Sequence, residues 1–282
     1  MNKIAAIATV LAASGAAFAQ IDGQSFAAEY GAPLWVQSIG TQFGNNTDPS
    51  VDFAGGSEID NIHAGLSGGV LSLGLGGNLE TNFNKINIAL DFIAGGQQTL
   101  SGLPNLGALD GLTLDNGFEA DVVLSYTAGN DPLETFIDGA TAGGAGGFLG
   151  GGDQINGTSV LLDGAAVNFF MDNSNVGGVG NLGDPNDSDP ALVDTGLEMS
   201  IDLAALGYTG GLVKITAWVN GSGNDFLANQ VVGGLPDGTG NLGGPSGVDF
   251  SQIEGDQFVV IPTPGAAGLL AVAGLAAIRR RR

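Results

Sequence analysis

The stretch Lys85-Ile-Asn-Ile-Ala-Leu-Asp-Phe-Ile93 decides the fold class that this chain is expected to adopt. Every second residue in it is apolar, namely Ile86, Ile88, Leu90 and Phe92. Successive side chains of a β-strand point to opposite faces, so a period of two predicts a half-buried strand. One face of this strand belongs to a core, and the other carries Lys85, Asn87, Ala89 and Asp91.

The same alternation recurs on both sides of this stretch. It predicts strands over 70–75, 118–126 and 197–203, and β-prone runs predict further strands over 34–39, 160–171, 212–220 and 258–261. Segment 94–116 is expected to be a long insertion, and 143–152 a flexible glycine-rich turn. The chain has 51 glycines in 282 residues and almost no helical pattern. These features predict an all-β protein, a β-sandwich or jelly roll of about 8–11 strands with long glycine-rich loops.

The first 19 residues have the pattern of an export signal. Lys3 supplies a positive charge, 4–13 form an apolar core, and Ala17 and Ala19 flank Phe18 in a small-x-small cleavage site for signal peptidase. Cleavage after Ala19 leaves Gln20 as the first residue. We therefore expect a signal peptide over 1–19 with a helical apolar part.

The last 21 residues, 262–282, form a second targeting element. Pro262 and Pro264 precede 14 residues without a polar side chain, and the chain ends with Arg279, Arg280, Arg281 and Arg282. As a helix this apolar run covers about 21 Å, which is short for the hydrocarbon core of a bilayer. The positive-inside rule places the arginines on the cytoplasmic side. We therefore expect a C-terminal apolar helix that holds the protein in the membrane only transiently.

Segment 262–282 resembles the PEP-CTERM sorting signal of Gram-negative bacteria, with Pro-Thr-Pro in place of the family's Pro-Glu-Pro. The resemblance implies recognition by a membrane protease of the exosortase type and removal of the tail. It also implies a final location at the cell surface or in the extracellular matrix. An ordinary C-terminal membrane anchor is the alternative.

Residues 20–261 remain as one predicted β-sandwich domain, and its charge excludes several classes of partner. This region holds all 29 acidic residues and two cations, Lys85 and Lys214, which gives a net charge of −27. Such a surface repels phosphate groups and anionic lipid, so we expect no nucleic-acid partner. The chain has no cysteine, so an exported domain of this kind depends on its hydrophobic core.

Four short segments of the domain carry a second resemblance. They are Ile21-Asp22-Gly23, Tyr30-Gly31-Ala32-Pro33, the run 77–91, and Gly117-Phe118-Glu119-Ala120-Asp121. Together they resemble carbohydrate-binding-module family 9 and DOMON-like sandwiches, and exported PEP-CTERM proteins that carry such a sandwich. The resemblance implies a sandwich that binds an extracellular polysaccharide.

Two tryptophans are the candidate sugar-binding residues. Trp218 falls on the more polar face of the predicted strand 212–220, where an exposed indole can stack on a pyranose ring. Cover of Trp218 by a second layer or loop is the alternative. Trp35 is either a second ligand-binding aromatic or part of the core.

Acidic residues supply two candidate Ca²⁺ sites. One loop places oxygen ligands at Asp184, Asn186, Asp187 and Asp189, although its spacing departs from the EF-hand pattern. Glu119 and Asp121 share the outward face of the predicted strand 118–126 and form the second set. A solvated turn and a solvated strand face are the alternatives.

The sequence therefore predicts an exported, sorted cell-surface or matrix protein that binds carbohydrate and is not an enzyme. Its single histidine, His63, gives little support to nucleophilic catalysis. A purely structural matrix component without a specific ligand is one alternative. A glycan-active enzyme with a pair of carboxylates is the other.

Overall fold

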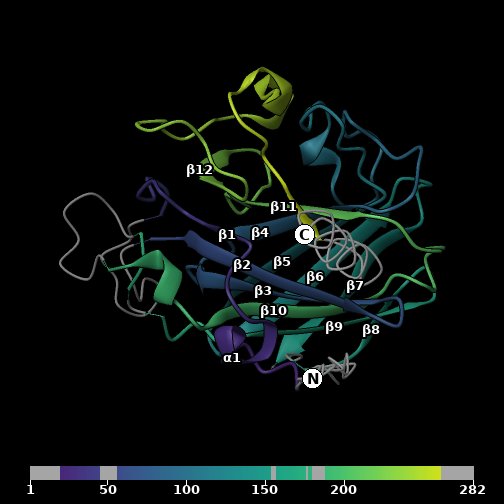
Figure 1. The fold of residues 1–282 in the computed structure, drawn as a ribbon, viewed down its shortest axis with the longest axis horizontal. Helices are drawn as coiled ribbons and strands as arrows, with labels where there is room; N and C mark the ends of the chain where they lie inside the picture. The colour runs from purple at the N-terminus through teal and green to yellow at the C-terminus, as the bar shows by residue number, and fades with distance from the viewer. Residues whose placement is uncertain (1–19, 45–55, 154–156, 176, 180–187, 262–282) are drawn as a thin grey trace, which may run out of the picture.

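Two antiparallel β-sheets packed face to face form the centre of the molecule (Figure 1). The computed structural model describes residues 20–44, 56–153, 157–175, 177–179 and 188–261. The first sheet has six strands, in the order β1 (Trp35–Val36), β2 (Glu58–Ser67), β3 (Val70–Asn78), β10 (Gly196–Asp202), β9 (Ala165–Met171) and β8 (Val160–Leu162). The second has seven, with the path β12 (Leu227–Val231), β11 (Val213–Asn220), β4 (Lys85–Asp91), β5 (Val122–Gly129), β6 (Glu134–Thr141) and β7 (Gly146–Asp153), and with β13 (Val259–Ile261) paired to β11.

The predicted all-β sandwich is thus confirmed, although the described residues form 13 strands and not the 8–11 expected. The helices of the described residues are short: α1 (Phe26–Tyr30) and the 3₁₀ turns η1 (Gly107–Leu109), η2 (Pro190–Leu192), η3 (Pro245–Gly247) and η4 (Phe250–Gln252). In the part of the chain that the structure describes, none of them has the length and hydropathy needed to cross a bilayer. The predicted signal helix and C-terminal apolar helix lie outside the described residues.

The main core lies between the two sheets, where the alternating apolar faces meet. Strand β4 and the residue that follows it contribute the four residues that the period predicts, Ile86, Ile88, Leu90 and Phe92. Opposite them, β3 and β10 pair in register, with Leu73 beside Met199. Each fully buried side chain of this size stabilises the fold by about 1.5–3 kcal/mol relative to an exposed one. The largest group of apolar side chains therefore holds the sheets together.

A second hydrophobic cluster, here called the outer core, covers the other face of the seven-stranded sheet. The β4–β5 connection lies over this face together with the segment that follows β12 (Figure 1). Thr113 of the connection forms a parallel bridge with Asp249 of that segment, so the two parts of the cover are joined. The connection buries six leucines, Leu100, Leu103, Leu106, Leu109, Leu112 and Leu114. Strands β4, β5, β11 and β12 of this sheet are therefore buried on both faces, whereas β7 at its edge is partly exposed.

The N-terminal segment packs on part of the outer face of the six-stranded sheet, over β2, β3 and β10. Phe26 of α1 packs on β3 at Gly74, where an added Cβ would lie 2.8 Å from the aromatic ring. The buried Glu198 of β10 accepts backbone hydrogen bonds from Asp22 (2.7 Å) and Gly23 (2.9 Å). Burial, and then the Glu198 carboxyl group, raise the pKa of Glu29 to about 7. A proton held near neutral pH relieves the repulsion between these two acids.

Several strands differ from the prediction. Strand β1 has two residues where six are expected, and β5 begins at Val122, so Phe118 and Ala120 pack in the outer core and not between the sheets. The predicted flexible turn 143–152 is wrong for most of its length, because 146–152 belong to strand β7. Glycine is disfavoured in strands, but β7 needs it where its backbone lies close to that of β6. A Cβ at Gly146 would lie only 2.1 Å from the carbonyl oxygen of Gly139 on β6. Strands β2, β6 and β12 are not predicted, and a β-bulge between Ile59 and Asn61 interrupts the alternation of β2.

Candidate functional site: paired pockets at the end of β4

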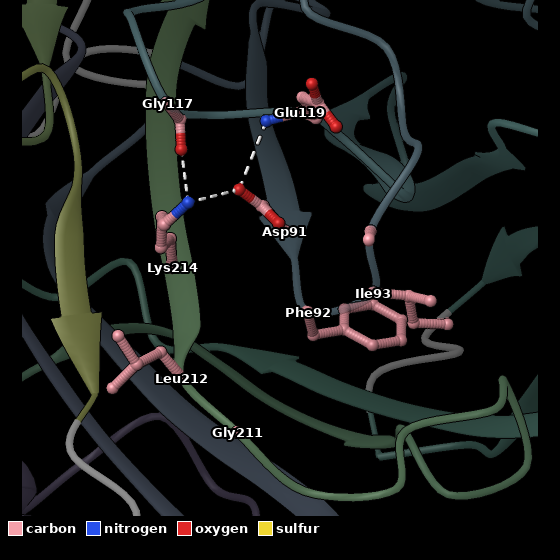
Figure 2. Close-up of a pocket in the computed structure, with 9 residues that line it drawn as sticks. Asp91, Phe92, Ile93, Gly117, Glu119, Gly211, Leu212 and Lys214 are labelled. Atoms are coloured by element: carbon pink, nitrogen blue, oxygen red, sulfur yellow. Dashed lines mark hydrogen bonds and ion pairs between the residues drawn. The ribbon is translucent and has the colours of Figure 1, made fainter.

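The site is built around an ion pair where β4 ends. Asp91, the last residue of β4, lies opposite Lys214 of β11 in the antiparallel ladder. The Lys214 Nζ donates to Asp91 Oδ2 over 2.7 Å and also to the carbonyl oxygen of Gly117 (Figure 2). The same ammonium lies 5.9 Å from the ring centroid of Phe258, within range of a cation–π interaction. Lys214 thus joins β4, β11 and the end of the β4–β5 connection.

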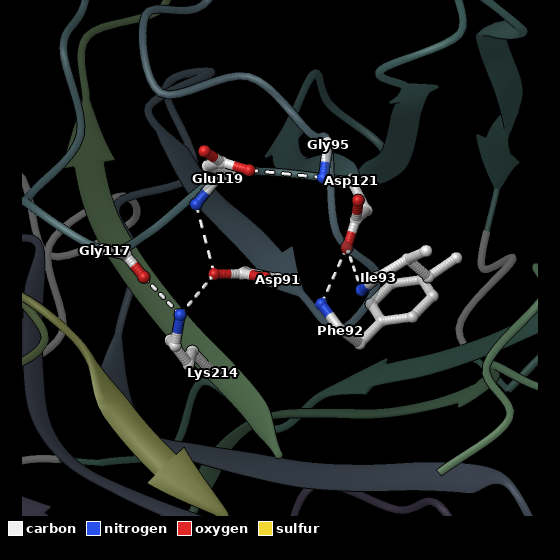
Figure 3. Close-up of polar contacts among 8 residues, drawn as sticks. All are labelled: Asp91, Phe92, Ile93, Gly95, Gly117, Glu119, Asp121 and Lys214. Carbon is white, nitrogen blue, oxygen red and sulfur yellow. Dashed lines mark hydrogen bonds and ion pairs between the residues drawn. The ribbon is translucent and has the colours of Figure 1, made fainter. Parts of the chain in front are cut away.

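Two further carboxylates enter from the end of that connection (Figure 3). The backbone N–H of Glu119 donates to Asp91 Oδ2 (3.1 Å), and Glu119 Oε2 accepts from the N–H of Gly95 (3.2 Å). Asp121 Oδ2 accepts from the N–H groups of Phe92 (2.6 Å) and Ile93 (2.7 Å). Burial raises the pKa of Asp121, and these two backbone donors oppose that rise. Asp121 therefore fixes the backbone at the point where the chain leaves β4.

Two adjoining pockets share the side chains of Phe92 and Ile93. The larger has a volume of about 420 Å³ and is lined by Asp91, Glu119, Leu212 and Lys214 in addition to the shared pair. The smaller has about 180 Å³ and is lined by Asp121, Thr141, Asp163 and Leu206 among others. Ile93 and Leu212 are 39 % and 54 % exposed, so apolar surface is open to solvent here. We refer to the two together as the paired pockets.

The paired pockets combine two kinds of surface. Carboxylates and one ammonium can exchange hydrogen bonds with hydroxyl groups. The apolar side chains of Phe92, Ile93 and Leu212 can cover a face that carries only C–H groups. A polyhydroxylated ligand with such faces matches this combination better than an anion does, because most of the charge in the pockets is negative.

The two candidate tryptophans lie elsewhere. Trp218 is on the face of β11 that the alternation predicts, but this face is covered, and its indole is 0 % exposed in the outer core. The ring contacts Phe250 edge-on, with 6.5 Å between centroids. An exposed stacking role for Trp218 is therefore corrected in favour of the covered alternative. Trp35 is half-buried on β1 and packs against the main core, and neither tryptophan lines the paired pockets.

Glu119 and Asp121, predicted as one calcium set, do lie near each other, one in each pocket. Within the described ranges no group of three or more Asp, Glu, His or Cys side chains is arranged to hold a metal ion.

Of the candidate calcium ligands in the acidic loop, Asp189 caps η2 by accepting a hydrogen bond from the N–H of Ala191 (3.0 Å). The remaining candidates lie outside the described residues: Asp184, Asn186 and Asp187, the cleavage-site alanines Ala17 and Ala19, and the sorting residues Pro262, Pro264, Arg279, Arg280, Arg281 and Arg282.

Asp91, Lys214 and the apolar residues Phe92, Ile93 and Leu212 are the site residues that the sequence did not indicate. Two signals were present. Asp91 and Lys214 both fall on the polar faces of predicted strands, and Lys214 is one of two lysines in 20–261. Their pairing depends on β4 and β11 being neighbours, although 123 positions separate the two residues.

Comparison of the chain with protein families, curated proteins and solved structures gave no match. The class of protein is therefore defined by the geometry alone: an antiparallel β-sandwich with paired pockets at one end of β4.

Proposed function

We propose that this is an exported cell-surface or extracellular-matrix protein that binds carbohydrate in the paired pockets and does not catalyse a reaction. The ligand is a neutral stretch of an extracellular polysaccharide. Asp91, Glu119 and Lys214 exchange hydrogen bonds with its hydroxyl groups, while Phe92, Ile93 and Leu212 contact its C–H faces.

One observation carries this proposal: exposed apolar side chains and hydrogen-bonding groups lie together in two adjoining pockets. The shared residues Phe92 and Ile93 connect the pockets, which suits a ligand with more than one sugar unit. The net charge of −27 over 20–261 favours a neutral ligand over an acidic one, because like charges repel.

We expect the purified protein to bind one or a few members of a polysaccharide panel, measured by isothermal titration calorimetry. Ile93→Ala removes exposed apolar contact area, and Glu119→Gln removes a carboxylate at the rim. Each change should weaken binding about tenfold or more, equivalent to about 1.4 kcal/mol. The matched control is Leu192→Ala, because Leu192 is 78 % exposed and lines neither pocket.

Two results would contradict the proposal. Absence of saturable binding to every polysaccharide favours a purely structural matrix component. Saturable binding that both Ile93→Ala and Glu119→Gln leave unchanged places the ligand elsewhere on the molecule.

The location is supported by the two ends of the sequence, the export signal 1–19 and the Pro-x-Pro, apolar and arginine segment 262–282. We propose that signal peptidase and a sorting protease of the exosortase type remove them. Mass spectrometry of the mature surface protein should then find a chain that begins at Gln20 and lacks Arg279 to Arg282. A mature chain that retains the arginines would show that the tail is a permanent anchor.

A further inference from the structure

Two buried carboxyl groups lie together on β2, away from the paired pockets. Glu58 and Asp60 are almost completely buried. The β-bulge between Ile59 and Asn61 inserts Asp60 as an extra residue without a partner in the β2–β3 ladder. Bulges of this kind change the direction of a side chain. Both carboxyl groups contact the same amide group, that of Asn175.

Three oxygens converge on this one amide nitrogen. Asn175 Nδ2 lies 3.1 Å from Glu58 Oε1, 3.3 Å from Asp60 Oδ2 and 2.6 Å from the carbonyl oxygen of Gly177. An amide NH₂ group has two hydrogens, so it cannot donate well to three acceptors. Carboxylate and carbonyl oxygens around one point are the arrangement that a hard cation requires.

Asn78 provides the second, independent observation. It lies directly opposite Glu58 in the β2–β3 ladder, so the two side chains emerge on the same face. Asn78 is completely buried, and among the described residues neither its amide oxygen nor its amide nitrogen has a hydrogen-bond partner. A buried amide without partners is unfavourable, and here it leaves room for a ligand that the described residues do not supply.

The domain itself offers no cation to this place. Residues 20–261 contain two lysines. Lys214 pairs with Asp91, and Lys85 interacts with Asp138. Asp60 accepts instead from the N–H of Val179 (2.7 Å) and from Asn175. Asp60 also forms a side-chain hydrogen bond with Glu58, so the two acidic side chains lie in direct contact.

We propose that Glu58, Asp60, Asn78 and the carbonyl group of Gly177 form a Ca²⁺ site that ties β2 and β3 to the chain at Gly177. The ligands are two carboxylates, one side-chain amide oxygen and one backbone carbonyl oxygen, all of the hard type that Ca²⁺ prefers. The cation replaces the Asn175 amide group as the common partner of the converging oxygens. This site is separate from both calcium sets that the sequence suggested.

The test is a calorimetric titration of the chelator-treated protein with CaCl₂, together with thermal unfolding in Ca²⁺ and in chelator. We expect one saturable site per chain and a higher Tm in Ca²⁺. The double variant Glu58→Gln/Asp60→Asn should lose the saturable binding. Asn78→Ala should weaken binding about tenfold or more. It should keep the wild-type Tm in chelator, because the Asn78 amide group has no hydrogen bond to lose with any described residue.

The matched control is the double variant Glu119→Gln/Asp121→Asn, which removes two carboxylates that lie outside the proposed site. It should bind Ca²⁺ as the wild type does. Absence of saturable Ca²⁺ binding by the wild type would overturn the proposal. So would binding that survives in both Glu58→Gln/Asp60→Asn and Asn78→Ala, or binding that only the control variant loses.

Discussion

Trp218→Ala is expected to lower the free energy of unfolding by about 3–5 kcal/mol, the range for truncating a fully buried tryptophan. The indole is completely buried between β11 and the loops of the outer core, where it contacts Phe250. Its removal leaves a cavity on the face of the sheet that the β4–β5 connection covers. Urea denaturation, followed by circular dichroism, measures the change.

Trp218→Phe separates packing from hydrogen bonding. The indole Nε1 is buried and has no hydrogen-bond partner among the described residues. This variant therefore loses volume but no hydrogen bond, and we expect a cost of about 1–2 kcal/mol. Leu192→Ala, at an exposed position, should stay within about 0.5 kcal/mol of the wild type. If Trp218→Ala lowers the free energy of unfolding by less than about 1–2 kcal/mol, the cost expected for Trp218→Phe, the outer core does not unfold together with the sandwich.

Lys214→Met is expected to cost about 1–3 kcal/mol, the penalty for leaving a buried polar group without its partner. The Asp91 side chain is 13 % exposed and then keeps only the backbone N–H of Glu119 among the donors described above. Methionine preserves most of the length of the lysine stem, so the loss is mainly that of the charge. Denaturant unfolding of the variant and the wild type measures it.

The double variant Asp91→Asn/Lys214→Met serves as the control for this prediction. Asparagine retains an oxygen that can accept from Glu119 and carries no charge that needs a partner. The double variant should therefore be less destabilised than Lys214→Met alone. Equal destabilisation of the two would show that the ammonium contributes through Gly117 and Phe258, and that the pairing with Asp91 adds little.

The period of two was sufficient to predict strands and their inward faces where both were regular. Residues 85–91 and 213–219 place their alternating apolar side chains in the main core as expected. The prediction fails where local propensity and tertiary pairing disagree. Five of the eight residues of β7 are glycine, and β2 contains a bulge. Neither strand therefore shows the alternation of apolar and polar residues, although both are hydrogen-bonded to neighbouring strands.

The candidate site was predictable only in its chemical character. The sequence shows that carboxylates outnumber cations and that Glu119 and Asp121 lie close together along the chain. It does not show that Asp91 and Lys214 face each other, because strand order is set by the packing of the whole sandwich. The same limit explains Trp218: its face follows from alternation, but its burial depends on a connection that starts more than 100 residues earlier.

By itself, then, the sequence determined the all-β class, the alternating faces of the regular strands and the strongly acidic character of the domain, because these depend on neighbouring residues and on composition. Only the tertiary structure decided which face of the seven-stranded sheet is covered, where the paired pockets lie and which buried acids meet Asn175. These features join segments far apart in the chain, and their positions follow from the packing of two sheets and an outer core as one unit.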